Sequence, residues 1–191
     1  MADRLLTIPN ILTLARLPLS VILFVCIYRE QWLAGLIVFG IAALTDWLDG
    51  FLARRLNQQS AIGRSLDPLI DKVMIGGAFI YFLRVKGTGL TEWMVTVVIG
   101  RELLITGLRG IMETQGVKFG ADWLGKLKTT LQCVVIVVIL LVLWLNVPSR
   151  PEDEFTYAAF LAQMVLIYAM ILVTIASGAQ YIIKAIRVWR V

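Results

Sequence analysis

Apolar residues follow one another in long stretches along this chain, and short polar segments separate these stretches. The two clearest stretches, residues 129–147 and 155–183, contain no charged residue. A helix of about 20 consecutive apolar residues is long enough to cross the hydrocarbon core of a bilayer. The pattern therefore predicts an integral membrane protein built of helices.

Helix start and stop signals divide the chain into six expected membrane helices. Residues before Pro9 are expected to form a short interfacial segment, because apolar side chains stand beside Arg4 there. No repeat or long linker is visible, so we expect a single domain over residues 1–191. The fold class is expected to be all-α, an integral membrane protein with six transmembrane helices. The expected helices cover residues 10–28, 32–55, 65–83, 91–113, 123–147 and 155–186.

Composition agrees with this class and narrows the chemistry. The chain is 59% hydrophobic and only 16% charged, whereas a soluble domain carries nearer a quarter of charged residues. The net charge of +5 is attributed to cytoplasmic loops and anionic lipid headgroups, so no nucleic-acid partner is expected. The absence of histidine removes the commonest general base and transition-metal ligand. Acid–base chemistry must therefore fall to carboxylates, lysines or tyrosines.

The distribution of basic residues predicts the orientation in the membrane. Cytoplasmic segments carry an excess of lysine and arginine. With the N-terminus inside, four basic residues fall on the outer side and ten on the inner side. We therefore expect a multi-pass protein of the inner (cytoplasmic) cell membrane with both termini in the cytoplasm. The inner residues are Arg4, Arg54, Arg55, Arg64, Lys118, Lys126, Lys128, Lys184, Arg187 and Arg190.

Four aspartates stand where the second and third expected helices meet, in "DWLDGFLARRLNQQSAIGRSLDPLID". Asp46 and Asp49 share a face of the second helix with Gly50 and Ala53, because each residue turns the helix by about 100° and positions three or four apart return to the same face. Asp67 and Asp71, four residues apart, share a face of the third helix. A hairpin of these two helices gathers the four carboxylates at one depth, just inside the cytoplasmic boundary.

Four carboxylates in a membrane helix pair need compensating positive charge. Divalent cations supply it and prefer oxygen ligands, and Mg²⁺ keeps open positions for substrate phosphates. Two helices that each carry two carboxylates therefore indicate a two-metal site for phosphoryl transfer, with small Gly50 and Ala53 leaving room for a bulky ligand. The plainer interpretation pairs the carboxylates with nearby cations at a solvated helix end. Those cations are Arg54, Arg55, Arg64 and Lys72.

The same residues resemble the signature of the CDP-alcohol phosphotransferase family at every defined position and spacing. The matching residues are Asp46, Asp49, Gly50, Ala53, Arg54, Gly63, Asp67 and Asp71. The resemblance extends to the six-helix plan. It implies transfer of a phosphatidyl group from a CDP-linked lipid to an alcohol with release of CMP, two divalent cations (Mg²⁺ or Mn²⁺) and a homodimer.

The resemblance also implies roles for individual residues. Asp46, Asp49, Asp67 and Asp71 would be the metal ligands, with Asp71 also the general base. Contacts to the CDP-diacylglycerol substrate would come from Gly50, Arg54 and Ser60. Asn10, Thr13 and Arg16 at the start of the first helix are expected to line the nucleotide side, although capping and ordinary packing explain them nearly as well.

Basic residues outside the signature indicate the acceptor alcohol. Arg101 falls near mid-membrane and needs an anionic partner. Glu102 is about 100° away around the helix, so we expect it to be poorly placed for that role. Arg109, Lys126 and Lys128 are expected beside the aspartates, in a basic pocket that suits a phosphorylated acceptor.

Three segments, "TIPNILTLARL", "RELLITGLR" and "GKLKTTLQ", resemble family members that use glycerol 3-phosphate. In that pattern Arg101, Arg109 and Lys126 would hold the acceptor phosphate. Inositol phosphate and phosphatidylglycerol remain alternative acceptors. Outside the enzyme class, buried carboxylates could mark a cation transporter, for which repeated halves and mid-membrane charges would be expected. A purely structural membrane protein would leave the aspartates unexplained.

Overall fold

The computed structural model describes residues 8–56, 61–114, 123–147 and 154–189, and these form six helices joined by short connections. No strand occurs among the described residues. The helices are α1 (Ile8–Tyr28), α2 (Trp32–Leu56), α3 (Ala61–Phe82), α4 (Glu92–Thr114), α5 (Trp123–Trp144) and α6 (Glu154–Trp189). Side chains within them are described for residues 14–46, 69–114, 123–147 and 154–187. The six predicted helices are thus confirmed, whereas the interfacial segment before Pro9 lies outside the described residues.

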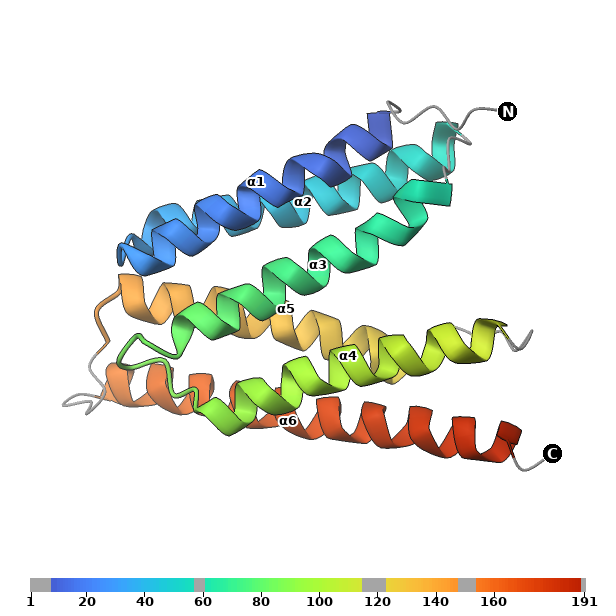
Figure 1. Ribbon diagram of the computed structural model, residues 1–191. Coiled ribbons are helices and arrows are strands. Elements are labelled where there is room, and N and C mark those ends of the chain that lie inside the picture. Colours follow the sequence, from blue (N-terminus) through green and yellow to red (C-terminus); the bar gives the residue numbers. More distant parts are fainter. Residues whose placement is uncertain (1–7, 57–60, 115–122, 148–153, 190–191) are drawn as a thin grey trace.

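Successive helices run in opposite directions, so the start of α1 and the end of α6 lie at the same end of the bundle (Figure 1). The helices form two groups, α1 to α3 and α4 to α6, which diverge toward that end (Figure 1). α1 packs closely on α2 and α3, and α6 packs on α4 and α5. Between the two groups, α2 packs on α5, and α3 makes smaller contacts with α4 and α5. The two groups are therefore held together mainly at the opposite end.

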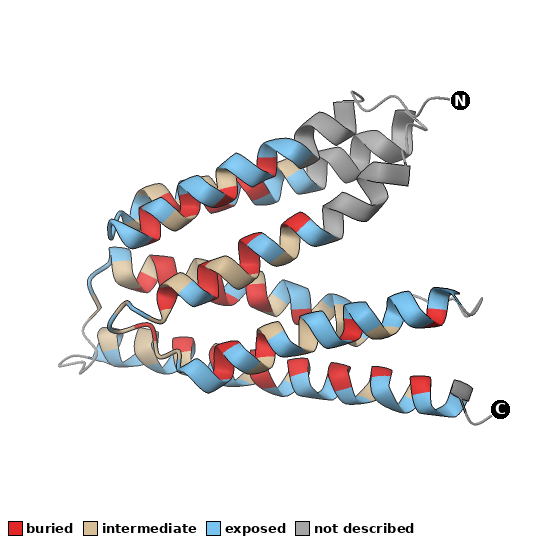
Figure 2. Ribbon diagram, viewed as in Figure 1, coloured by how far each residue is buried: buried red, intermediate tan, exposed pale blue. Residues whose placement is uncertain are grey.

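The packed core explains this arrangement. It joins the second half of α1, the first half of α2, the second halves of α3 and α5, the first half of α4 and the middle of α6. Leu23, Phe39, Phe79, Ile136 and Ile167 are among its members, each with at most 2% of its surface exposed. Figure 2 shows the buried residues on the faces that the helices turn toward one another. Burial of these side chains holds the helices together at this end of the bundle.

The outer surface of the bundle is apolar, as expected in lipid. Large hydrophobic side chains are exposed on all six helices, among them Val25, Ile37, Val73, Leu103 and Leu172. Within the described residues, two helices are long and apolar enough to cross a membrane, Trp123–Trp144 and the Glu154–Arg187 part of α6. Shorter apolar helical segments occur at Leu14–Tyr28 and Trp32–Asp46. That all six helices cross the membrane stays a prediction, as does the single domain.

Two helix ends show why the turns fall where they do. Glu30, after α1, and Asn146, after α5, have positive φ angles of 57° and 51°. The amides that follow them donate to the carbonyls of Cys26 at 2.8 Å and of Val142 at 3.1 Å, which satisfies acceptors that the helices leave unpaired. This left-handed cap ends each helix. The cap after α5 explains why this helix ends at Trp144, whereas the sequence predicts an end at residue 147.

The connection between α3 and α4 is held by a side chain of α6. Gln163, which is 1% exposed, donates through Nε2 to the carbonyls of Gly87 at 3.0 Å and Thr88 at 2.9 Å. Gly89 has a φ of 68°, and a Cβ there would lie 2.5 Å from the sulfur of Met164. Only glycine fits this close approach without strain. The loop is thereby fixed against α6 at the packed end.

We expect Gln163→Leu to lower the free energy of unfolding by about 1–3 kcal/mol, because two carbonyls in a buried setting lose their donor. Thermal unfolding of the purified protein in detergent micelles measures the change. Gln31→Leu is the matched control, since Gln31 is exposed, and it should stay within about 0.5 kcal/mol of the original protein. Equal stability of the two variants would contradict the role assigned to Gln163.

Candidate active site

Three helices meet at a buried arginine. Arg16, on α1, has no exposed side-chain surface. Its Nη1 donates to Oδ1 of Asp46, on α2, at 2.6 Å and to Oδ1 of Asp71, on α3. A buried guanidinium is strongly destabilising unless carboxylates compensate it. The ion pairs therefore draw one aspartate from each of two helices to the same point.

The two aspartates remain accessible on their other sides. The Asp46 side chain is 50% exposed and the Asp71 side chain 35% exposed, although both contact a fully buried cation. One guanidinium contacts both carboxylates. Carboxylate oxygens that stay accessible are suited to a further hard cation such as Mg²⁺. The Arg16–Asp46–Asp71 group is called the carboxylate cluster below.

The structure brings together two of the four predicted aspartates. The backbone of α2 includes Asp49, Gly50 and Arg54, that of α3 includes Asp67, and that of α1 includes Asn10, but their side chains lie outside the described residues. Ser60 also lies outside them. Among the described residues, no group of three or more aspartate, glutamate, cysteine or histidine side chains is placed to hold a metal. A complete two-metal site is thus a prediction that these residues leave open.

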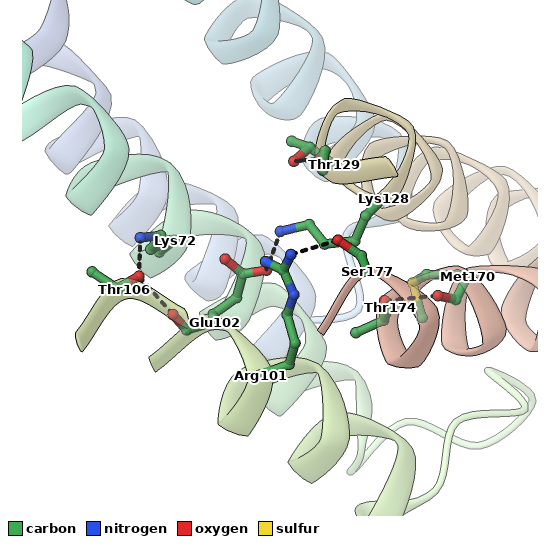
Figure 3. Close-up of polar contacts among 10 residues, drawn as sticks. Lys72, Arg101, Glu102, Thr106, Lys128, Thr129, Met170, Thr174 and Ser177 are labelled. Carbon is green, nitrogen blue, oxygen red and sulfur yellow. Dashed lines mark hydrogen bonds and ion pairs between the residues drawn. The ribbon is translucent and has the colours of Figure 1, made fainter. Parts of the chain in front are cut away.

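A second cluster of charges joins α4, α5 and α6 (Figure 3). Glu102 accepts a hydrogen bond from Nζ of Lys128 and lies 3.4 Å from Nη1 of Arg101. Arg101 also donates through Nη2 to Ser177 Oγ at 2.6 Å and lies over the ring of Tyr181 at 5.7 Å. We call Arg101, Glu102 and Lys128 the basic cluster, because two cations share one carboxylate.

The basic cluster corrects one expectation. The sequence predicts that Glu102 is poorly placed to pair with Arg101, because their Cα–Cβ directions differ by about 100°. That prediction is wrong, since the two side chains form an ion pair at 3.4 Å. Both side chains are long enough to bend toward each other. Their exposed fractions are only 11% and 15%, so mutual neutralisation favours the contact.

The three residues predicted to hold an acceptor phosphate occupy different surroundings. Arg101 lies in the α4–α6 contact, where a Cβ on Gly178 would be 3.2 Å from its Cγ. Arg109, two turns further along α4, is 46% exposed and donates to Glu113 at 3.2 Å. Lys126 is exposed in the first turn of α5. Arg109 and Lys126 are therefore accessible to a solute, and Arg101 is held between helices.

The two clusters open onto one cavity of about 450 Å³ between α3, α4 and α5, with Phe24 of α1 on one wall. Ligand pockets of small molecules commonly have volumes of about 300–1,000 Å³. Asp71 lines the cavity from the carboxylate cluster, and Glu102 and Lys128 line it from the basic cluster. Lys72 also lines it and donates to Thr106 of α4. A ligand in this cavity would therefore have carboxylates and ammonium groups of three helices around one end.

Sequence reasoning missed three polar residues of this region or gave them other roles. Arg16 is predicted on the nucleotide side, and its contact with Asp46 and Asp71 is not foreseen. Lys128 is predicted in a basic pocket, but not in a buried pair with Glu102. Gln132, which is 2% exposed and lines the cavity, is not singled out. A signal was available, because Gln132 is a polar residue within the uncharged stretch 129–147.

The chain is similar in sequence to proteins of known family. The family model described as CDP-alcohol phosphatidyltransferase matches residues 6–189. A CDP-diacylglycerol–glycerol-3-phosphate 3-phosphatidyltransferase of Bacillus subtilis (strain 168) is 33% identical over 192 residues, which cover 93% of this chain and 94% of the relative. The protein of the same name from Escherichia coli (strain K12) is 34% identical over 187 residues, with the same coverage of both chains.

We expect Arg16→Leu to make the protein's stability depend on divalent cations. The substitution leaves Asp46 and Asp71 without the guanidinium between them, which should cost about 1–3 kcal/mol after allowance for their partial exposure. A divalent cation bound by the two carboxylates offsets part of that loss. Melting temperatures with EDTA and with Mg²⁺ measure the effect.

The Mg²⁺-induced rise in melting temperature should be larger for Arg16→Leu than for the unmodified protein. Arg109→Leu removes a cation from an exposed position and serves as the control, with a rise like that of the unmodified protein. If Arg16→Leu responds to Mg²⁺ no more than Arg109→Leu does, a divalent cation does not take the place of the guanidinium between these two carboxylates.

Proposed function

We propose that this chain, which belongs to the CDP-alcohol phosphatidyltransferase family, transfers the phosphatidyl group of CDP-diacylglycerol to glycerol 3-phosphate. The products are phosphatidylglycerol phosphate and CMP, as a phosphatidylglycerophosphate synthase would form them. The names of the relatives support the two substrates. The structural observation that carries the proposal is the cavity with Asp71 on one wall and the Glu102–Lys128 pair on another.

The carboxylates suit divalent cations and, through them, a diphosphate. Asp46, Asp49, Asp67 and Asp71 would hold two cations, Mg²⁺ or Mn²⁺, and support comes from the partial exposure of the Asp46 and Asp71 carboxylates, which contact one guanidinium. Bound there, the cations would neutralise the diphosphate of the lipid substrate and the charge that develops on the leaving CMP. We assign Asn10, Gly50, Arg54 and Ser60 to the CDP side of the substrate.

Asp71 is the general base of the proposed reaction. A hydroxyl oxygen of glycerol 3-phosphate forms a new bond to the phosphorus that carries the diacylglycerol, and the bond from this phosphorus to the CMP oxygen breaks. The hydroxyl proton passes to Asp71, whose carboxylate lines the cavity and is partly exposed. The ion pair with Arg16 keeps this carboxylate oriented toward the other aspartate-bearing helix.

Cationic residues at the same end of the bundle could bind the phosphate group of the acceptor. We assign Arg101, Arg109 and Lys126 to it, and Lys128 supplies further positive charge to the cavity wall. The accessibility of Arg109 and Lys126 supports a role in capturing a soluble anion. Arg101 lies deeper and is already paired with Glu102, so its contribution is to set the charge of the wall.

We place the end toward which the two groups of helices diverge at the cytoplasmic face of the inner cell membrane, with all six helices spanning the bilayer. The proposed working form is a homodimer. Support for the orientation comes from the excess of basic residues at this end, and support for the spans from the apolar outer surface. Glycerol 3-phosphate would then reach the site from the cytoplasm, and CMP would leave to the same side.

The proposal is tested by measuring CMP release from CDP-diacylglycerol with a panel of acceptors. The purified protein in detergent should release CMP with glycerol 3-phosphate, and much more slowly with inositol phosphate, phosphatidylglycerol or serine. Faster turnover with another acceptor would overturn the assignment of glycerol 3-phosphate, but it would still support phosphatidyl transfer as the reaction. No CMP release with any alcohol would overturn the transferase function.

We expect Asp46→Asn, Asp49→Asn and Asp67→Asn to abolish turnover by weakening cation binding, and Asp71→Asn to lower kcat by about 10²- to 10⁴-fold. Glu92→Gln, at an exposed carboxylate in the first turn of α4, is the control and should be fully active. Steady-state kinetics over a range of Mg²⁺ concentrations measure both effects. Near-native turnover of any aspartate variant at low Mg²⁺ would remove that residue from the site.

Arg109→Ala and Lys126→Ala should raise the KM for glycerol 3-phosphate by about 10- to 150-fold, because each removes a charge-assisted hydrogen bond to phosphate. The KM for CDP-diacylglycerol should change little. Arg109→Lys should recover only part of the loss, since a point charge does not replace the fork of a guanidinium. Arg84→Ala, outside this end of the bundle, is the control. A rise in the lipid KM alone would place both residues on the nucleotide side.

A further inference from the structure

The cavity between α3, α4 and α5 changes in polarity along its length. Asp71, Lys72, Glu102 and Lys128 line the part nearest the two charged clusters. Further along the same helices the lining is apolar and includes Gly76, Ile80, Val98 and Ile99. From Asp71 to Ile80, α3 rises by about 13 Å. A ligand that fills the cavity must therefore be charged at one end and apolar at the other.

The cavity borders side chains on the outer surface of the bundle. Val73, Ile80 and Leu103 line it, and all three are exposed, Leu103 to 68%. α3 and α4 also make a smaller contact than most neighbouring helices in the bundle. An amphipathic molecule in the bilayer can thus reach the cavity from the side, between α3 and α4, without passing through the packed core.

Gln132 is a polar residue beside the apolar part of the cavity, and its side-chain amide is not fully hydrogen-bonded. It follows Lys128 by one turn on α5, lines the cavity and is 2% exposed. Its Nε2 atom is buried and has no hydrogen-bond partner among the described residues. An unsatisfied buried amide is destabilising by an amount comparable to a lost hydrogen bond. A ligand with a hydrogen-bond acceptor at this depth would satisfy it.

The surroundings of Gln132 select a neutral acceptor. The nearest cation along α5, Lys128, already donates to Glu102. An anionic oxygen would be poorly stabilised by one amide, whereas an ester carbonyl needs only one donor. A diacylglycerol lipid carries ester carbonyls between its phosphate and its acyl chains. Along such a lipid, charge is followed by carbonyl groups and then by hydrocarbon. Along the cavity, charged residues are likewise followed by Gln132 and then by apolar residues.

We propose that Gln132 donates a hydrogen bond to an ester carbonyl of the lipid substrate, whose acyl chain lies in the cavity against Gly76 and Ile99. The inference rests on the proposed function for the identity of the lipid. It assigns a substrate-binding role to Gln132 and explains why no large side chain stands at residue 76. A Cβ at Gly76 would lie 3.8 Å from Ile99, so a methyl group fits there and a longer side chain enters the cavity.

The first experiment compares Gln132→Leu with the unmodified protein on two lipids. One is CDP-diacylglycerol, and the other is the dialkyl ether analogue, which has no ester carbonyl. Loss of a neutral hydrogen bond should raise the KM for the ester about 2- to 12-fold. The KM for the ether should be the same for both proteins, and so should the KM for glycerol 3-phosphate.

Two results overturn the inference. If Gln132→Leu changes the ester and ether KM values equally, the amide does not bind the carbonyl and its role is structural. If neither value changes, Gln132 does not contact the lipid. Absence of turnover by the unmodified protein would instead overturn the proposed function. Turnover of the unmodified protein therefore tests the proposed function, and the change between the unmodified protein and Gln132→Leu on each lipid tests the inference.

The second experiment tests where the acyl chain lies. Gly76→Leu should raise the KM for CDP-diacylglycerol by at least about tenfold, since a buried chain loses apolar contact with the cavity wall. Gly76→Ala should leave it unchanged. Gly100→Leu adds the same side chain to α4 at an exposed position, where a Cβ would have no atom within 4 Å, and it should also leave the KM unchanged. Equal effects of Gly76→Leu and Gly100→Leu would remove the acyl chain from this cavity.

Discussion

Arg16 carries a positive charge at a position with no exposed surface, so the helices around it must supply negative charge. Asp46 and Asp71 do so from two different helices. The consequence is geometric as well as energetic, because one guanidinium nitrogen fixes the distance between α2 and α3 at the depth of the site. The aspartates are then held close together without being closed off, since each keeps a large part of its surface accessible.

The rest of the bundle can be understood from the need to keep this region open. The packed core, with large buried side chains such as Phe79 and Ile136, lies at the other end, and Gln163 ties the α3–α4 connection to α6 there. Nearer the site, a polar pair, Lys72 with Thr106, joins α3 to α4. A cavity is therefore compatible with a stable fold.

Much of the fold could be predicted from the sequence, because its elements are long apolar runs separated by proline, glycine and charged residues. Predicted and observed helix ends differ by a few residues, and α3 begins at Ala61, four residues before the predicted start. Helical spacing fixes the faces of Asp46 and Asp71 and so predicts that their carboxylates meet. It does not predict the partners of Arg16 and Glu102, since long side chains bend toward partners on helices whose relative rotation only packing decides.

The two charged clusters have opposite composition, and this bears on the choice of acceptor. The carboxylate cluster has two negative charges for one positive, and the basic cluster has two positive charges for one negative. A small alcohol that also carries a phosphate is polarised in the same sense as the cavity between them. Its phosphate is attracted to the basic cluster, where Arg101 and Lys128 outnumber Glu102. Its hydroxyl is then free to turn toward Asp71. An uncharged alcohol gains no such orientation, and a cationic one such as choline would be drawn toward the carboxylates and away from the basic wall. The same field therefore binds the acceptor and orients its nucleophile, which favours a phosphorylated acceptor over the other alcohols.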